Sequence, residues 1–328
     1  MKYPGIGEVP HQYAQDFLDL ETGADGLFKV GQGDVLRIVT PRDRKVEIIL
    51  FADRALCHVK SAMGYPALYP LPDARFEGPA EAVLMDLDGT SVHSEHFWIW
   101  IIEQTVARLL DNKSFRLGEV DLPHVSGHSV SEHLQYCIEK YCPEQTVEQA
   151  RTHYFQITHF EMSEILKGRG RADAFEPAPG LKEFLTELKS HNIRIGLVTS
   201  GLYEKAWPEI VSAFRQLEMG DPAKFYDAII SAGAAIRPGE AGTLGELTPK
   251  PHPWLYAETA RVGLGIETSR RHRVIGMEDS GAGVVSVRLA GFACLGIQGG
   301  NIAQSGVRPL LHSDYATLMD SLPTILGK

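Results

Sequence analysis

The stretch VLMDLDGTSVH, residues 83–93, begins as an apolar run and then places two aspartates one residue apart. Because side chains alternate along a strand, Asp86 and Asp88 are expected to point to the same side, about 7 Å apart. Two carboxylates at the end of a buried strand repel each other, which raises one pKa or requires a cation. At the carboxyl edge of an open α/β sheet, where ligands bind, the pair predicts a cation site or separate acid and nucleophile roles. The residues alone also allow a tight turn at Asp88 and Gly89, with Asp86 an ordinary strand-end group.

Similar apolar runs recur from Glu81 onward, and helix-like segments separate most of them. The runs are AVLMDL, IRIGLVTS, FYDAIIS, RVIGMED and FACLGIQ. This alternation predicts an α/β fold with a doubly wound parallel sheet and covering helices. Residues 94–175 break the alternation, because they have apolar residues at helical spacing and almost no strand signal. They predict a helical subdomain inserted after the first strand.

The amino-terminal segment carries no motif that indicates a function. Its one clear feature is a predicted β-hairpin, in which DVLRIVT and KVEIILF (residues 34–40 and 45–51) are joined by the turn-like PRDR. The proline-rich stretch GYPALYPLPDARFEGP, residues 64–79, is interpreted as a connector. The expected division of the chain is an amino-terminal extension over 1–80, a core over 81–93 and 176–328, and a helical insertion over 94–175.

Composition and charge exclude several classes of protein. The formal net charge is -10, and the 32 lysine and arginine residues are scattered, which argues against a nucleic-acid-binding protein. We find no stretch of about 18 apolar residues and no apolar segment of a secretory signal, so we expect a cytoplasmic protein that does not enter a membrane. The four cysteines show no metal-ligand spacing and are expected to be reduced thiols.

Two further motifs could bind an anionic substrate. In IRIGLVTSG a predicted strand ends in Thr199, Ser200 and Gly201 before a helix, and hydroxyls with free backbone N–H groups there suit a phosphate. The same residues also fit an ordinary helix N-cap. Lys250 lies between two prolines in LTPKPHPW, where it has little structural reason to be, although a single loop lysine is usually just solvated.

A fourth motif, RVIGMEDSGAG, is an apolar run that ends in Glu278 and Asp279. A second acidic pair at a strand end is what a hard, oxygen-seeking ion such as Mg²⁺ requires. All four motifs fall at the carboxyl ends of predicted parallel strands or in the loops beyond them. Their occurrence together favours one shared site over four separate structural features.

The residues DLDGT, LVTSG, the lysine of KP, and GMEDSGAG together resemble the four signature motifs of the haloacid dehalogenase superfamily. The resemblance runs from Glu81 to near the carboxyl terminus and implies a Rossmann-like core. The helical insertion after the first motif resembles the type 1 cap of phosphoglycolate phosphatase, β-phosphoglucomutase and related sugar phosphatases. The first 80 residues have no counterpart in the family pattern, so the resemblance assigns them no role.

The resemblance also implies roles for single residues. Asp86 would attack phosphorus as the nucleophile, and Asp88 would act as general acid for the leaving oxygen and later as base for water. Thr199 would contact the phosphoryl group, and Lys250 would clamp it with its positive charge. The full set expected at the phosphate adds Gly89, Ser200, Gly201 and, in the insertion, His128.

A Mg²⁺ ion is the cofactor that the resemblance implies. Its ligands would be Asp86, the backbone carbonyl of Asp88, and Asp279, with Glu278 orienting the metal or its waters. The physical argument agrees, because a carboxylate attacking a phosphate dianion is opposed by charge that Mg²⁺ and a lysine can neutralise.

The resulting prediction is a Mg²⁺-dependent phosphatase that hydrolyses a small phosphorylated metabolite through an aspartyl-phosphate, as a monomer or homodimer. Asp88 argues against carbon–halogen cleavage, because the dehalogenases of the superfamily lack this second acid. The segment after the first motif departs from relatives, so His93, His96 and His128 either contact substrate or serve as hinge or packing residues.

Three alternatives remain open. A phosphomutase is disfavoured because HVSGHSVSEHL lacks the arginine that sugar phosphomutases use. A phosphonate hydrolase would need a cap lysine with a depressed pKa; the candidates by position are Lys113, Lys140 and Lys167. A non-catalytic binding or regulatory protein that recruits partners through its amino-terminal segment is the third.

Overall fold

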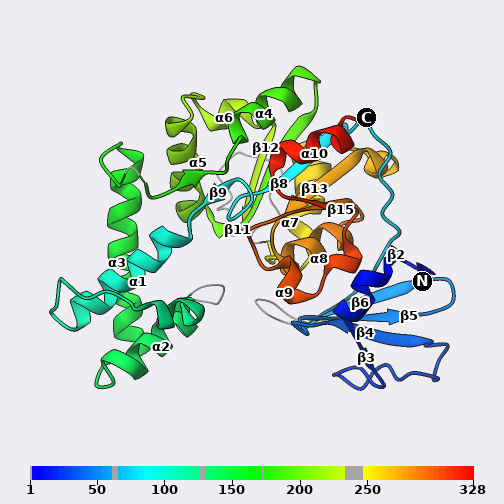
Figure 1. The fold of residues 1–328 in the computed structure, drawn as a ribbon, viewed down its shortest axis with the longest axis horizontal. Helices are drawn as coiled ribbons and strands as arrows, with labels where there is room; N and C mark the ends of the chain where they lie inside the picture. The colour runs from blue at the N-terminus through cyan, green and yellow to red at the C-terminus, as the bar shows by residue number, and fades with distance from the viewer. Residues whose placement is uncertain (1, 61–65, 126–129, 172, 233–246) are drawn as a thin grey trace. The chain divides into compact units, whose positions relative to one another are not determined.

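In the computed structural model, the chain folds into two compact units (Figure 1). The residues that the structure describes are 2–60, 66–125, 130–171, 173–232 and 247–328. The first unit comprises residues 1–91, 178–206 and 220–328, and the second comprises 92–177 and 207–219. Among the described residues, no helix combines the length and the apolar character needed to cross a membrane.

A six-stranded sheet in which all neighbouring strands are parallel forms the centre of the first unit. In sheet order its strands are β12 (Ala228–Ala232), β11 (Arg194–Leu202), β8 (Ala82–Asp86), β13 (Val274–Glu278), β14 (Ala293–Ile297) and β15 (Ser313–Tyr315). The five strands predicted from apolar runs are confirmed. The sequence did not indicate β15, because this edge strand has three residues and only partly buried or exposed side chains.

The register of the three central strands brings acidic side chains to one edge of the sheet. Asp86 at the end of β8 pairs with Val198 of β11, and Met85 pairs with Met277 of β13. Glu278 therefore ends β13 level with Asp86. Because all three strands run the same way, their carboxyl ends and the loops that follow meet at this edge.

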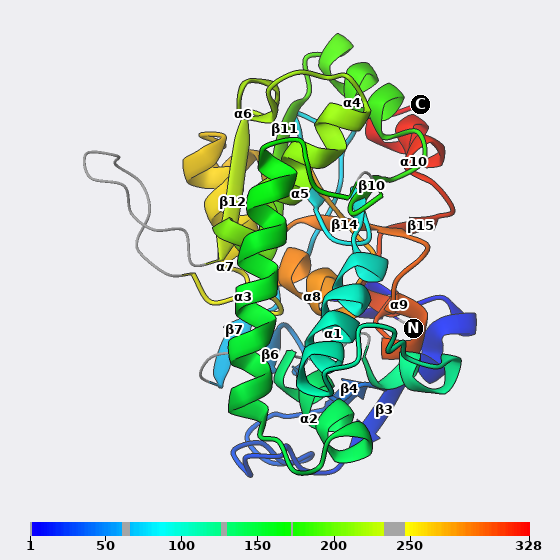
Figure 2. The ribbon, with the colours of Figure 1, turned by 90° about the vertical axis from the view of Figure 1, so that its left-hand side faces the viewer.

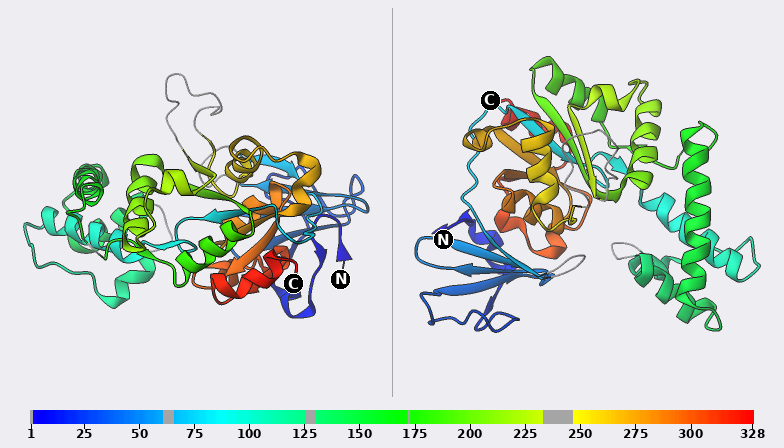
Figure 3. Two further views of the ribbon diagram at one scale, coloured as in Figure 1. Left: turned by 90° about the horizontal axis from the view of Figure 1, so that it is seen from above. Right: turned by 180° about the vertical axis from the view of Figure 1, so that it is seen from behind.

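Helices cover both faces of this sheet, as the predicted doubly wound α/β core requires. Figure 3 shows α10 (red) and η3 (gold) on opposite sides of the strands, and α10 packs on α4 while α7 packs on α8. The helices of this unit are α4 (Leu181–Ser190), the first turn of α5 (Tyr203–Gln216), α6 (Pro222–Phe225), α7 (Trp254–Glu258), α8 (Gly281–Leu289), α9 (Ile302–Ser305) and α10 (Leu318–Ile325). Short helical turns add η3 (Thr259–Gly263), η4 (Thr268–Arg273) and η5 (Arg308–Leu310).

The amino-terminal segment folds into an antiparallel sheet of five strands in chain order. The five strands are β3 (Phe17–Leu20), β4 (Arg37–Pro41), β5 (Val46–Leu50), β6 (Ala55–Val59) and β7 (Ala67–Pro70). Before them, β1 (Lys2–Tyr3) and β2 (Gly7–Glu8) form a separate antiparallel pair, and η1 (His11–Asp16) follows. The predicted hairpin is confirmed as β4 and β5. The connector interpretation is wrong for β7, which pairs with β6 because prolines are tolerated at the ends of an edge strand.

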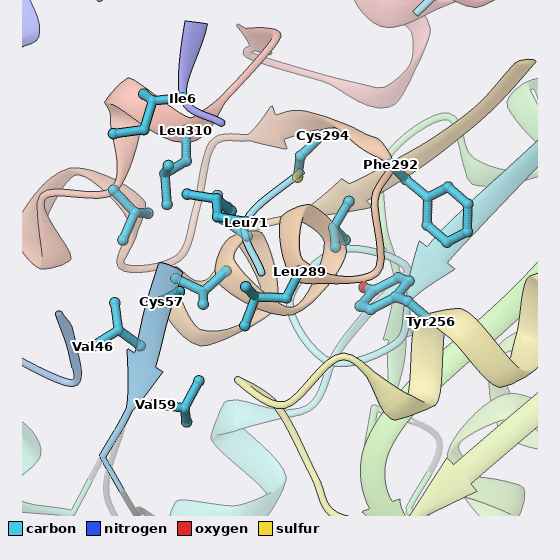
Figure 4. Packing of buried hydrophobic residues seen from close by; sticks show 14 of the residues in the cluster. Ile6, Val46, Cys57, Val59, Leu71, Tyr256, Leu289, Phe292, Cys294 and Leu310 are labelled. Carbon is cyan, nitrogen blue, oxygen red and sulfur yellow. The ribbon is translucent and has the colours of Figure 1, made fainter. Parts of the chain in front are cut away.

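The amino-terminal sheet shares one apolar cluster with the parallel-sheet core. In Figure 4, Cys57 and Val59 of β6 lie beside Leu289 of α8, with Leu71 close to them. Removal of these side chains from water is the main stabilising contribution at this junction. All four cysteines of the chain are free and buried.

Buried polar groups also join the amino-terminal segment to the core. Asp16 is fully buried and accepts hydrogen bonds from Arg308 Nε at 2.7 Å and Arg308 Nη2 at 3.0 Å, and it also pairs with Arg42. The buried Arg288 of α8 donates to the carbonyl oxygen of Gly5 at 2.6 Å. These contacts connect residues nearly 300 positions apart, so they fix the segment to the core from both ends of the chain.

The second unit is built mainly from three helices, as predicted for the insertion (Figure 2). Its elements are β9 (Val92–His93), α1 (Glu95–Leu109), η2 (Glu119–His124), α2 (Val130–Tyr141), α3 (Val147–Leu166) and β10 (Glu176–Pro177). Helix α3 begins at a capping box, in which Thr146 and Gln149 satisfy each other's backbone N–H groups. The carboxyl-terminal part of α5 belongs to this unit, and Arg215 Nη1 donates to the Ile165 carbonyl oxygen at 2.8 Å.

We expect Asp16→Ala to lower the free energy of unfolding by about 2 kcal/mol, because it leaves charged donors without their buried acceptor. Asp19→Ala is the matched control, since the Asp19 side chain is 65% exposed in its ion pair with Arg37. Exposed pairs contribute less than about 1 kcal/mol. Urea denaturation measures both changes, and equal losses would show that Asp16 does not fasten the segment.

Candidate functional site

Three buried carboxylates meet at the carboxyl edge of the parallel sheet. Asp86 ends β8, Glu278 ends β13, and Asp279 follows directly. Each of the three offers an oxygen atom within 4.8 Å of the others, and all three are buried. Such a set of oxygen donors can hold a hard divalent cation.

Lys250 brings positive charge into this cluster. Its Nζ lies 2.6 Å from Glu278 Oε1 and also pairs with Asp86, and the Lys250 side chain is only 7% exposed. Burial favours the neutral amine, but the carboxylates of Asp86 and Glu278 outweigh burial and raise the Lys250 pKa above its ordinary value. The lysine is therefore a buried cation, and the interpretation of Lys250 as a merely solvated loop residue is wrong.

One lysine does not balance the charge of three carboxylates. Burial, together with the nearby negative charge of Glu278, raises the pKa of Asp86 well above its usual range, although Lys250 opposes the shift. The same two causes raise the pKa of Asp279 to about 7. Raised pKa values of neighbouring carboxyl groups indicate that their negative charge is not fully balanced, and a bound cation would supply the missing positive charge.

Glu278 is held by hydrogen bonds from the protein itself. Tyr256 Oη donates to Glu278 Oε1 at 2.5 Å, and Ser280 Oγ donates to Glu278 Oε2 at 3.0 Å. The Tyr256 ring also lies under Lys250, with Nζ 5.2 Å from the ring centroid. Sequence reasoning did not single out Tyr256, although it lies six residues after Lys250 in the short helix α7, because an aromatic residue in a helix is usually part of a core.

Asp88 lies outside the group of three carboxylates and is partly exposed. Its Oδ1 is 3.7 Å from Nζ of Lys205, which lies on the first turn of α5. The two side chains are 35% and 36% exposed, so this pair is in contact with water. The two aspartates of the opening motif thus have different surroundings, which is what separate roles would need. Sequence reasoning missed Lys205, because a lysine on a helix surface is usual.

The Thr-Ser-Gly motif lies at the end of β11, next to β8. Thr199 is buried, and its Oγ1 accepts a hydrogen bond from the Gly201 backbone N–H at 2.9 Å. The backbone N–H of Lys250 donates to Ser200 Oγ at 3.2 Å. The motif therefore contacts the lysine loop, and the contact of Thr199, Ser200 and Gly201 with a phosphoryl group remains a prediction.

Gly89 lets the chain pass close to Asp279. It has a φ of +85°, and a Cβ atom built on it would lie 2.0 Å from Asp279 Oδ2. The neighbouring Thr90 Oγ1 is 3.5 Å from Asp279 Oδ1. A side chain at position 89 would therefore displace one carboxylate of the acidic cluster.

The histidines singled out from the sequence are not brought to this cluster by any described contact. His128 lies outside the described residues. His93 and His96 are exposed residues of the helical unit. Their roles stay open predictions.

The cap lysine Lys140 does not have the property that a phosphonate hydrolase needs. Its Nζ lies 2.5 Å from Asp121 Oδ1, and hydrogen bonding to Asp121 and Tyr136 raises its pKa. A Schiff-base lysine needs a depressed pKa, so Lys140 is unsuited to that role. Lys167 is likewise in an ion pair, 3.0 Å from Glu164 Oε1.

Residues 83–232 match the sequence profile of the haloacid dehalogenase-like hydrolases. This part of the chain, a little under half of it, is similar to that family. The matched region begins in β8 and ends in β12, so it includes the aspartate motif, the helical insertion and the Thr-Ser-Gly motif. No curated protein matches the sequence significantly.

Several solved structures share the fold of this chain. CbbY from Rhodobacter sphaeroides in complex with phosphate is 16% identical, with a TM-score of 0.53, over 76% of this chain and 100% of CbbY. A predicted phosphoglycolate phosphatase from Haemophilus somnus is 15% identical, with a TM-score of 0.55, over 75% of this chain and 98% of its own. A family IA hydrolase from Entamoeba histolytica is 18% identical, with a TM-score of 0.53, over 76% and 100%. At these identities the likeness shows the fold.

Gly89→Ala is expected to weaken the affinity for Mg²⁺ about tenfold, because the new methyl group displaces the Asp279 carboxylate. The affinity follows from the rise in melting temperature on Mg²⁺ titration. Gly220→Ala is the matched control: Gly220 has a φ of +79° and its added methyl would meet nothing within 4 Å. Both variants bear the same backbone strain, so equal Mg²⁺ affinities would contradict the prediction.

Proposed function

We propose that this protein is a Mg²⁺-dependent phosphatase that hydrolyses a small phosphomonoester through an aspartyl-phosphate on Asp86. The observation that carries the proposal is the cluster of three buried carboxylates around the ammonium group of Lys250. A site with this charge pattern suits a substrate that is anionic and binds together with a cation. The match of residues 83–232 to the haloacid dehalogenase-like hydrolases and the likeness to CbbY, which was solved with phosphate, support the same activity.

Asp86, Asp279 and the backbone carbonyl of Asp88 are the groups that would hold Mg²⁺. When bound, the ion would neutralise negative charge on the phosphoryl oxygens. Glu278 already accepts hydrogen bonds from Tyr256 and Ser280 and pairs with Lys250. It is therefore suited to orient its neighbours instead of binding the metal directly.

The proposed reaction has two displacements at phosphorus. A carboxylate oxygen of Asp86 forms a bond to phosphorus while the bond to the ester oxygen breaks, and the leaving alcohol takes a proton from Asp88. A water molecule then attacks the aspartyl-phosphate and gives a proton to Asp88, which releases inorganic phosphate and restores the Asp86 carboxylate. The partial exposure of Asp88 allows it to exchange protons with solvent between turnovers.

Binding of the phosphoryl group is assigned to residues beside the nucleophile. Lys250 supplies a fixed positive charge, and Thr199 supplies a hydroxyl at the end of the adjacent strand. Ser200 and Gly201 belong to the same turn, in which the Gly201 N–H donates to Thr199 Oγ1 and so orients that hydroxyl. Preorganised donors of this kind stabilise the charge that develops on the transferring group.

The helical unit is proposed to act as the cap that selects the substrate. Within this unit, the stretch HVSGHSVSEHL lacks the arginine used by sugar phosphomutases. We therefore favour a phosphatase, which hydrolyses the phosphoenzyme, over a phosphomutase, which transfers the phosphoryl group to a sugar hydroxyl. An assay that measures both inorganic phosphate and isomerised sugar phosphate distinguishes the two reactions.

Asp86→Asn is expected to lower kcat for p-nitrophenyl phosphate more than about 10³-fold, because an amide oxygen does not form the covalent intermediate. Release of inorganic phosphate in the presence of Mg²⁺ measures the effect. Asp314→Asn serves as the control, because Asp314 is exposed on the edge strand β15, two strands from Glu278. Activity retained by the Asp86 variant would overturn the proposed mechanism.

Asp88→Asn is expected to slow hydrolysis by about 10²- to 10⁴-fold for alkyl phosphates such as glycerol phosphate. The loss should be smaller in the phosphorylation step with p-nitrophenyl phosphate, because p-nitrophenolate leaves without a proton. A stopped-flow burst separates that step from hydrolysis of the aspartyl-phosphate. If Asp88→Asn slows phosphorylation equally with alkyl phosphates and with p-nitrophenyl phosphate, Asp88 is not the general acid.

A further inference from the structure

The edge strand of the amino-terminal sheet contacts the loop that carries Lys250. The Tyr69 hydroxyl, on β7, is hydrogen-bonded at 2.8 Å to Nδ1 of His252, two residues after Lys250. The two rings meet edge to face with centroids 5.8 Å apart, and the ring of Trp254 meets that of Tyr69 at 6.2 Å. A segment outside the region that matches the family therefore touches the loop of the proposed phosphate clamp.

Three side chains from three different elements hold this loop. At the end of β11, Ser200 Oγ accepts a hydrogen bond from the Lys250 backbone N–H at 3.2 Å. On α8, the Ser286 hydroxyl donates to the carbonyl oxygen of His252 at 2.6 Å. Tyr69 supplies the third contact. The first two come from the parallel-sheet core, and the third comes from the amino-terminal sheet.

The His252 ring relies on Tyr69 for its hydrogen bonding. His252 is 2% exposed, and burial lowers its pKa, which favours the neutral imidazole. Its other ring nitrogen, Nε2, is buried and has no hydrogen-bond partner within the described residues. Without the Tyr69 hydroxyl both ring nitrogens would be buried and unpaired, a cost in free energy that movement of the ring and its loop would relieve.

The amino-terminal sheet is attached to the core beside this contact. Tyr69 pairs with Cys57 in the ladder between β7 and β6, and its ring packs against the apolar cluster that joins the sheet to the core. Figure 4 shows the β6 residues Cys57 and Val59 next to Leu289 of α8, the helix that also carries Ser286. The position of β7 is therefore set relative to the same helix that holds the His252 backbone.

We propose that the amino-terminal sheet positions Lys250 through the hydrogen bond between Tyr69 and His252. The inference rests on the proposed function, in which the Lys250 ammonium group neutralises the phosphoryl group. Because Lys250 Nζ pairs with both Asp86 and Glu278, a shift of its loop changes the positive charge at the nucleophile. Tyr69 is a positioning residue, since it touches His252 and none of the reacting groups.

Tyr69→Phe tests the proposal, because it keeps the ring and removes the hydroxyl. The measurement is the affinity for orthovanadate with Mg²⁺, by calorimetry, in the wild-type chain and in a Lys250→Met background. With Lys250 present we expect the substitution to weaken vanadate binding about fivefold, the equivalent of one hydrogen bond. In the Lys250→Met background we expect no further loss, because the effect acts through the lysine.

Tyr3→Phe is the matched control. This substitution removes a different amino-terminal hydroxyl, that of Tyr3 on β1, which accepts a hydrogen bond from Arg37. We expect the affinity for vanadate to stay unchanged in this variant. Equal losses for Tyr69→Phe in both backgrounds, or an unchanged affinity in the wild-type background, would overturn the positioning role. If Lys250→Met itself binds vanadate as tightly as the wild type, the proposed phosphate clamp is wrong, and the positioning role falls with it.

Discussion

The close approach of Asp86, Glu278 and Asp279 in a buried place is the constraint on which the site depends. Like charges away from water repel strongly, so the arrangement persists only where neighbouring groups offset the charge. Lys250 provides part of that compensation, and Tyr256 adds a hydrogen bond to one carboxylate. The negative charge that remains at this edge of the sheet is what makes it suited to a cation and an anionic substrate together.

The same constraint explains features of the surrounding fold. Parallel strands deliver their carboxyl ends to one edge, so two acidic motifs far apart in the sequence become neighbours without a long loop. Position 89 is a glycine because the chain there passes too close to the Asp279 carboxylate to leave room for a side chain. Two serines hold the backbone of the lysine loop: Ser200 accepts a hydrogen bond from the Lys250 N–H, and Ser286 donates one to the His252 carbonyl oxygen. These contacts keep the Lys250 ammonium group beside the carboxylates.

The amino-terminal segment changes the picture of what belongs to this core. Asp16 and Arg308 join the two ends of the chain, and a shared apolar cluster covers α8. Through Tyr69 the segment also touches the loop of Lys250. It is an integral layer of the first unit and not an appendage, which gives a stretch without a recognisable motif a physical connection to the chemistry. The helical unit, by contrast, is compact in itself.

Local sequence patterns were sufficient for much of the fold. The five strands β8, β11, β12, β13 and β14 appeared as short apolar runs, because strands of a covered parallel sheet bury both faces. The three helices of the insertion appeared as apolar residues at helical spacing. The edge strand β15 and the strand β7 did not, since edge strands are short, partly exposed and tolerant of proline. Their pairing partners, and not their composition, make them strands.

For the site, the sequence by itself determined which chemical groups are available: paired aspartates, a Thr-Ser-Gly turn, a lysine between prolines and a second acidic pair. Only the tertiary structure decided that Asp86, Glu278 and Asp279 form one buried cluster around Lys250, while Asp88 pairs with Lys205 nearer to solvent. It alone also placed Tyr256 under the lysine and Tyr69 against His252. The physical reason is that pKa values, hydrogen bonds and burial depend on distances between residues far apart in the chain, and no local pattern encodes those distances.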